Sequence, residues 1–128
     1  MAKSQMKSDA VGPLILLESP FMDDREFVAK SDQCLDRVAK WLEDFDPEEA
    51  DYATADGSVT IEFPDGAKFI LSRQSAGKQM WLAAGAHGYH YNYDSSRDTW
   101  LDDKDGHELY ARLAEAVSAQ IGHAVESA

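Results

Sequence analysis

The 128-residue sequence predicts an α+β fold, a two-layer α/β sandwich whose N- and C-terminal helices pack on one face of an antiparallel sheet of about six strands. Two segments with the apolar periodicity of amphipathic helices, one towards each end of the chain, enclose a middle region of short strand-like segments and tight turns. Because the connections in this region are short, neighbouring strands should run antiparallel. Each helix carries one apolar stripe, so both can cover the same sheet face and leave the other face open.

The first helix is expected over residues 23–45. Asp23 and Asp24 suit its N-terminus, where the helix dipole favours negative charge, and Pro47 should end it. Its apolar residues fall on one arc of about 120°, which should face the core. They are Phe27, Cys34, Leu35, Val38, Trp41, Leu42 and Phe45. Cys34 is therefore expected to be a packed thiol and not a reactive one.

Strands are expected wherever apolar and polar residues alternate between two turn signals. The turns are placed at Asp56-Gly57, at Pro64-Asp65-Gly66 and between Gly85 and Gly88. The expected strands cover residues 51–55, 59–63, 68–73, 79–83 and 89–93, and a short segment around Trp100.

The last element is a second helix. Asp105 is its expected N-cap, and Glu108 three residues later would complete a capping box. Gly122 should stop this helix. Its apolar stripe repeats at helical spacing and consists of Leu109, Leu113, Val117 and Ile121.

Charge and cysteine content restrict the function. With 24 acidic and 12 basic residues, the formal charge of -12 disfavours nucleic acid and anionic membranes and favours metal cations and basic proteins. The longest apolar run, Leu14–Leu17, is too short to span a membrane. The single cysteine suits the reducing cytoplasm. Residues 1–21 lack clean periodicity, and we expect a flexible extension there.

Six carboxylates crowd into nine residues where the first helix should end, and no Lys or Arg occurs from Trp41 to Ala67. Each exposed acid at a helix C-terminus is destabilising by roughly 0.3–1 kcal/mol, because the helix dipole is negative there. This strain favours a shallow, weak site for hard cations such as Ca²⁺, Mn²⁺ or iron. The alternative is a solvated surface that only keeps the protein soluble. The six residues are Glu43, Asp44, Asp46, Glu48, Glu49 and Asp51.

The fourth expected strand points to an interaction surface. If Met80 and Leu82 face the core, alternation places Gln79 and Trp81 on the open sheet face. An exposed Trp with a neighbouring Arg73 would be a candidate hot spot for protein binding. The alternative is that Trp81 belongs to the core. Familiar catalytic spacings such as H-E-x-x-H and G-x-S-x-G are absent from the sequence, so no enzyme is expected.

The segments Arg73-Gln74, Gln79-x-Trp81-Leu82-Ala83 and Gly88-Tyr89-His90-Tyr91 resemble the signature sheet region of the frataxin family, specifically of its bacterial members. The resemblance runs from about Met22 to Gly122. It implies a frataxin-like domain at residues 22–122, preceded by the extension at residues 1–21 and followed by a C-terminal tail at residues 123–128.

The resemblance implies an iron-binding protein of iron–sulfur cluster assembly, in the bacterial cytoplasm. Iron (Fe²⁺ or Fe³⁺) would bind weakly, and other divalent cations would bind as well. The partners would be the cysteine desulfurase and the scaffold protein, with this chain acting as iron donor, regulator or both. A monomer is expected, with metal-dependent oligomers.

The family's functional positions carry over onto two groups of residues. Acidic family positions correspond to Asp24, Asp32, Glu43, Asp44 and Asp46, and Asp36, Glu48, Glu49 and Asp51 extend the same ridge. The tryptophan implicated in partner contact corresponds to Trp81, with Arg73, Gln74, Gln79 and His90 around it.

Two other functions stay open from the sequence. The first is a ferroxidase that oxidises and stores iron in oligomers, an activity ascribed to some frataxins. The second is an acidic protein-interaction domain without a metal role.

Overall fold

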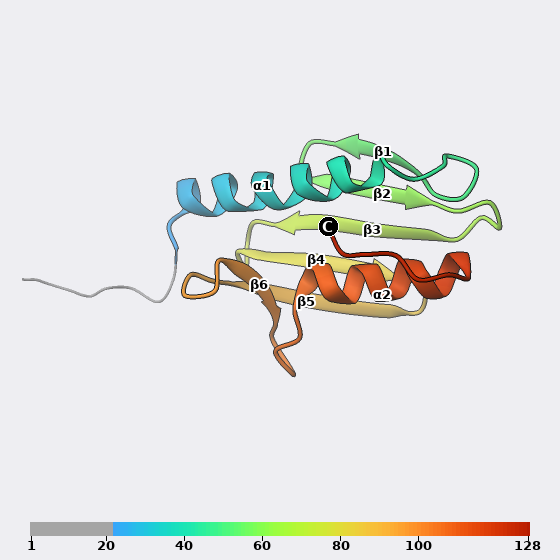
Figure 1. Cartoon of the computed structure of the whole chain (residues 1–128). Helices are drawn as coiled ribbons and strands as arrows, with labels where there is room; N and C mark the ends of the chain where they lie inside the picture. Colours follow the sequence, from blue (N-terminus) through green and yellow to red (C-terminus); the bar gives the residue numbers. More distant parts are fainter. Residues whose placement is uncertain (1–21) are drawn as a thin grey trace, which may run out of the picture.

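The computed structural model describes residues 22–128, and the extension expected at residues 1–21 lies outside them. Two helices cover one face of a six-stranded antiparallel sheet (Figure 1). The predicted α+β sandwich is therefore confirmed. In chain order the elements are α1 (Asp24–Leu42), β1 (Asp51–Ala55), β2 (Ser58–Glu62), β3 (Lys68–Gln74), β4 (Gln79–Ala84), β5 (His87–Asp94), β6 (Thr99–Asp102) and α2 (Leu109–Ile121).

The sheet is a simple meander in the order β1-β2-β3-β4-β5-β6. Each strand pairs with its neighbours in the sequence, for example Leu71 with Leu82 and Trp81 with His90. Short turns make every pairing antiparallel, as the sequence predicts. Strand β5 begins earlier than expected, at His87, so Gly88 lies inside the strand opposite Ala83 and not in the preceding turn.

The core lies between the two helices and the sheet face beneath them. Alternate strand residues point towards the helices because successive side chains of a strand face opposite ways. The buried apolar residues of α1 are Phe27, Cys34, Leu35, Val38 and Leu42. The largest fully buried side chains of the sheet are Ile61, Leu71, Met80, Leu82, Tyr91 and Trp100. The buried residues of α2 are Leu109, Tyr110, Leu113, Ala114 and Val117.

Helix α1 begins as expected and ends earlier than expected. The carboxylate of Asp23 accepts a hydrogen bond from the backbone N–H of Glu26 at 2.8 Å, which caps the first turn. The helix ends at Leu42, three residues before the predicted Phe45. The N–H of Phe45 bonds the carbonyl of Leu42 at 3.1 Å, so the chain tightens into turns before it reaches Pro47.

Helix α2 starts at a different residue from the one predicted. Its N-cap is Glu108, whose carboxylate accepts from the N–H of Ala111 at 2.8 Å. The predicted N-cap, Asp105, accepts instead from the backbone N–H of His107 at 3.0 Å. Gly122 ends the helix in the left-handed conformation (φ 88°), as expected for a C-terminal glycine.

The segment after α2 folds back over the helices. In Figure 1 the chain beyond α2 returns between α2 and α1. The indole N–H of Trp41 donates to the carbonyl of Glu126 at 2.8 Å, and Arg37 donates to the main-chain oxygen of Ala128 at 2.7 Å. Residues 123–128 are therefore held against α1 by hydrogen bonds.

Candidate functional site

The six acids at the end of α1 stay together at one end of the molecule. We call them the helix-end cluster: Glu43, Asp44, Asp46, Glu48, Glu49 and Asp51. Glu43 caps α1, the next four lie in the turns that follow, and Asp51 opens β1. All of them are exposed except Glu49, which is half-buried. The negative charge therefore faces solvent, where a cation or a basic surface can reach it.

Ion pairs divide the nine predicted metal-binding acids into two groups. Asp24 lies 3.3 Å from the Lys78 ammonium on the β3–β4 turn, and Asp32 lies 2.7 Å from the Arg73 guanidinium on β3. Glu49 contacts the imidazole of His123 at 2.7 Å. Within residues 22–128 the other six make no ion pair; they are Asp36, Glu43, Asp44, Asp46, Glu48 and Asp51. Uncompensated charge is thus concentrated at the C-terminal end of α1.

Two acids of the cluster are oriented by the backbone. One carboxylate oxygen of Asp46 accepts from the N–H of Glu48 at 2.9 Å, and one of Asp51 accepts from the N–H of Tyr52 at 2.9 Å. The second oxygen of each group has no hydrogen-bond partner within the described residues. Such oxygens are the ligands that hard cations prefer.

Two shallow hollows border the helix-end cluster, and Asp46 and Glu49 line both of them. The first, of about 490 Å³, extends over Phe63 and Pro64 towards the end of α2. The second, of about 450 Å³, extends over Trp41 and the segment after α2. Both combine carboxylates with apolar walls, a composition that suits a basic side chain with an aliphatic stem.

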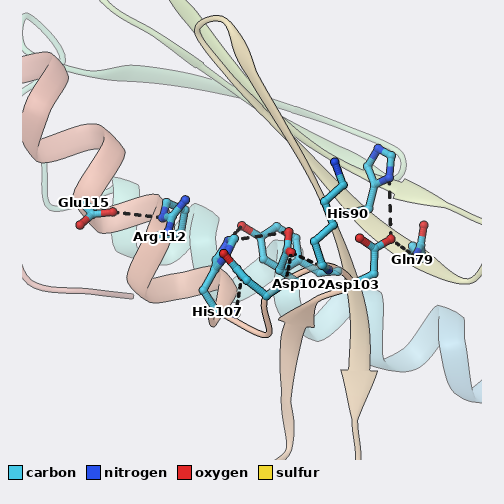
Figure 2. Close-up of polar contacts among 10 residues, drawn as sticks. Gln79, His90, Asp102, Asp103, His107, Arg112 and Glu115 are labelled. Atoms are coloured by element: carbon cyan, nitrogen blue, oxygen red, sulfur yellow. Dashed lines mark hydrogen bonds and ion pairs between the residues drawn. The ribbon is translucent and has the colours of Figure 1, made fainter.

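The open sheet face presents Trp81, as the alternation of β4 predicts. The indole is 37% exposed and stacks on the imidazole of His90, with ring centroids 4.2 Å apart and planes 16° from parallel. Its N–H donates to the amide oxygen of Gln79 at 3.0 Å. The amide nitrogen of Gln79 donates in turn to Asp103 at 3.1 Å, and Figure 2 shows Asp103 between Gln79 and His90. These contacts fix the indole in one orientation at the surface.

Arg73 does not lie on that open face, contrary to the sequence interpretation. It shares the helix-covered face with Leu71, and its side chain is 11% exposed. The guanidinium donates to Asp32 at 2.7 Å and to the Ser31 hydroxyl at 3.0 Å. It also packs on Gly57 (φ 80°), where an added Cβ would approach it to 3.3 Å. Arg73 therefore joins β3 to α1 and to the β1–β2 turn.

Gln74, the next residue along β3, is half-buried and pairs with Gln79 in the sheet register. The sequence reasoning missed Ile70, which is 40% exposed and lies opposite Ala83 on the open face. The signal was available, because Ile70 alternates with the core residues Phe69 and Leu71.

Cys34 is buried in α1, as predicted, and burial raises the pKa of its thiol to about 12. A thiol in this state is neither a nucleophile nor a metal ligand at neutral pH. Among residues 22–128, no helix is long and apolar enough to cross a membrane.

These features define a class: a two-layer α/β sandwich with an acidic rim and an open sheet face that presents an indole. A family model described as a frataxin-like domain matches residues 20–123. The chain belongs to the frataxin-like family.

Curated relatives carry the name iron-sulfur cluster assembly protein CyaY. The chain is 37% identical over 105 residues to the one from Thioalkalivibrio sulfidiphilus, covering 81% of this chain and 98% of the relative. It is 40% identical over 105 residues to the one from Dechloromonas aromatica, covering 81% of this chain and 97% of the relative.

Solved structures agree with the fold. Frataxin from Psychromonas ingrahamii, of the CyaY family, matches with a TM-score of 0.74 at 31% identity, covering 82% of this chain and 97% of that one. A trimeric frataxin from the yeast Saccharomyces cerevisiae, complexed with ferrous iron, matches with a TM-score of 0.57 at 23% identity, over 84% of this chain and 92% of that one. At that identity the likeness concerns the fold alone.

Proposed function

We propose that this chain is an iron-binding protein of iron–sulfur cluster assembly, acting through the cysteine desulfurase and the scaffold protein. The observation that carries the proposal is the helix-end cluster at the surface of a frataxin-like fold, whose carboxylates other than that of Glu49 make no ion pair within residues 22–128. The names of the bacterial relatives support the process.

Iron is the cargo of the helix-end cluster in this proposal. Among the contacts of residues 22–128, Asp46 and Asp51 each keep a carboxylate oxygen free of hydrogen bonds, and Glu43 and Asp44 stand exposed beside them. Carboxylate oxygens suit Fe²⁺ and, more strongly, Fe³⁺. Because the ligands are exposed and lie on turns, binding should be weak and shared with other divalent cations. Asp24 and Asp32 pair with Lys78 and Arg73 and lie roughly 28 and 16 Å along α1 from Glu43 at a rise of 1.5 Å per residue, so this site does not include them.

The same cluster docks on a basic surface of the desulfurase. The hollows on either side of Asp46 and Glu49 can take Lys or Arg stems against Phe63 and Trp41 while the carboxylates meet the charged heads. Cation and partner therefore compete for the same oxygens. Exposed charges are screened over about 8–10 Å at physiological ionic strength, so binding should weaken with salt.

Trp81 supplies the second contact, on the open sheet face. Exposed Trp residues are frequent anchors of protein interfaces, and Gln79 and His90 hold this one in place. We assign the scaffold protein to this face, with Ile70 extending its apolar surface. The variant Trp81→Ala should lose scaffold binding and keep iron binding.

Anaerobic Fe²⁺ titration followed by amide NMR tests the proposal. Resonances of residues 43–51 should shift or broaden first, and the triple variant Glu43→Gln/Asp44→Asn/Asp46→Asn should lose the effect. Asp24→Asn, which removes an acid paired with Lys78, is the matched control and should respond like the wild type. Unaltered resonances at residues 43–51 in the wild type would favour a plain acidic interaction domain.

Redox catalysis is not part of the proposal. Within residues 22–128 the helix-end cluster includes one imidazole contact, His123 with Glu49, and no thiol. Oxygen consumption after Fe²⁺ addition should be equal for the wild type and the triple variant. Faster consumption by the wild type would favour the ferroxidase alternative.

A further inference from the structure

A second group of metal-ligating side chains lies at the opposite edge of the sheet, in the loop between β6 and α2. Asp102 ends β6, Asp105 lies in the loop, and His107 lies just before the N-cap of α2. One ligand atom from each of these residues lies within 4.8 Å of the other two. Figure 2 shows Asp102 and His107 converging beside α2. We call these three residues the loop cluster.

Asp102 is unusual because its carboxylate is buried, with its side chain only 5% exposed. One oxygen, Oδ1, accepts from the N–H groups of Lys104 at 2.8 Å and of Asp105 at 3.0 Å. Within residues 22–128 the other oxygen, Oδ2, accepts no hydrogen bond, and it lies 3.9 Å from Nε2 of His107. A buried carboxylate oxygen without a donor is unfavourable. A cation beside His107, or the imidazole itself when protonated, would stabilise this oxygen.

His107 is held in place from both sides. Its Nδ1 lies 2.6 Å from Oδ1 of Asp105, and its Nε2 lies 2.8 Å from the hydroxyl of Tyr91. The rings of Tyr89 and Tyr91 pack against it edge-on, with centroid distances of 5.2 and 5.3 Å. A metal-bound imidazole is commonly oriented by a hydrogen bond at the ring nitrogen that does not bind the ion, so metal binding here requires His107 to give up one of these two contacts. Asp105, whose side chain is 65% exposed, leaves the cluster accessible from solvent.

We propose that Asp102, Asp105 and His107 bind a single divalent ion of the first transition series. Metal–ligand bonds of about 2.0–2.2 Å allow two ligands of one ion to lie up to about 4.4 Å apart. The observed limit of 4.8 Å therefore requires only small side-chain rotations. An imidazole with two carboxylates favours Mn²⁺, Fe²⁺ or Zn²⁺ over Ca²⁺ and Mg²⁺, which prefer oxygen alone. The remaining coordination positions would be filled by water.

The local charge also favours a cation. Asp102, Asp103 and Asp105 outnumber the one cation of this loop, Lys104, and the guanidinium of Arg112 on α2 is paired with Glu115 at 3.0 Å and lies over the ring of Tyr89. This proposal does not depend on the helix-end cluster, which lies on other elements. The two sites should therefore bind metal independently.

Paramagnetic broadening by Mn²⁺, measured on the full chain, tests the proposal. Amide resonances of residues 102–108 should broaden, and they should do so equally in the variant Glu43→Gln/Asp44→Asn/Asp46→Asn. If residues 43–51 of the wild type do not broaden while residues 102–108 do, the proposed function fails and the loop cluster stands. Absence of broadening at residues 102–108 in the wild type would overturn the loop cluster as a metal site.

Variants of the ligands provide the second arm of the test. Substitutions of residues that only orient a ligand typically weaken metal affinity by about 10–100-fold, so His107→Gln and Asp105→Asn should weaken Mn²⁺ and Zn²⁺ binding at this site at least tenfold. Asp102→Asn keeps an oxygen for the two backbone donors and should weaken binding by a similar factor. The exposed His87→Gln is the matched control and should bind like the wild type. Equal affinity of His107→Gln and the wild type would mean that the network is structural only.

Discussion

The guanidinium of Arg73 lies 2.7 Å from the carboxylate of Asp32, and this contact ties β3 to α1. It alters both sites that the sequence suggests. Arg73 is drawn under the helix and away from Trp81, and Asp32 becomes a compensated acid. Of the nine candidate ligands, those without an ion pair within residues 22–128 are thereby limited to Asp36 and the helix-end cluster apart from Glu49.

The substitution Arg73→Met should lower the free energy of unfolding by about 1–2 kcal/mol. The variant loses the hydrogen bonds to Ser31 and Asp32, while the methionine keeps part of the packing. The expected loss is kept small because Asp32 is exposed, and solvent weakens its attraction to Arg73. Urea unfolding measures the change. Lys78→Met is the control, because its partner Asp24 is almost fully exposed, and it should change stability by less than about 0.5 kcal/mol. If Arg73→Met keeps full stability and loses partner binding, Arg73 acts at the surface after all.

The contact between His123 and Glu49 should make stability depend on pH. The hydrogen bond that the His123 imidazole donates to the Glu49 carboxylate raises the pKa of His123 above its ordinary value of 6.5. The folded state therefore holds this proton more tightly than the unfolded chain. Its stabilising effect is fully present below pH 6.5 and is lost as the pH rises through the raised pKa.

Melting temperatures of His123→Gln and the wild type, measured across this range, test the contact. The difference between the two should be largest near pH 5.5–6, where His123 is charged and Glu49 is still ionised, and should shrink above neutral pH. The exposed His87→Gln is the control and should follow the wild type. A difference that stays constant with pH would mean that the ion pair contributes nothing.

Divalent cations should raise the melting temperature by relieving repulsion at the end of α1. A ligand present at ten times its Kd stabilises the folded state by about 1.4 kcal/mol, which corresponds to a rise of about 5–6 °C for a domain of this size. Mn²⁺ and NaCl should be compared at equal ionic strength, with Mn²⁺ having the larger effect. Because two metal sites are proposed, the rise in melting temperature with Mn²⁺ should be smaller in Glu43→Gln/Asp44→Asn/Asp46→Asn than in the wild type. An undiminished rise in that variant would place the stabilising ion elsewhere.

The fold could be predicted from the sequence because its signals are local and repeated. The apolar arc of α1 predicts the buried face of that helix, and the alternation of Met80 and Leu82 predicts the buried face of β4. Gly122 predicts the end of α2. The same alternation, applied to Phe69 and Leu71, would have placed Arg73 on the covered face. The predicted start of α2 was wrong because the carboxylate of Asp105 is hydrogen-bonded to His107, so Glu108 caps the helix instead.

The candidate sites were less accessible to sequence reasoning because they depend on partners distant along the chain. The run of acids from Glu43 to Asp51 is contiguous, so its clustering was visible. The pairing of Asp24 with Lys78 and of Glu49 with His123 depends on the folded sheet and on the returning C-terminal segment. The geometry of the loop cluster depends on the contact of His107 with Tyr91 and on the burial of Asp102, and no short-range sequence pattern predicts either of them.

The most direct test of the central claim is the affinity of this chain for its cognate cysteine desulfurase, with and without Fe²⁺. Isothermal titration calorimetry under anaerobic conditions is suitable, at low and at high salt. We predict that saturating Fe²⁺, added salt and the variant Glu43→Gln/Asp44→Asn/Asp46→Asn each weaken binding. Affinity that is unchanged by all three would contradict the account, because the helix-end carboxylates would then serve neither the cation nor the partner.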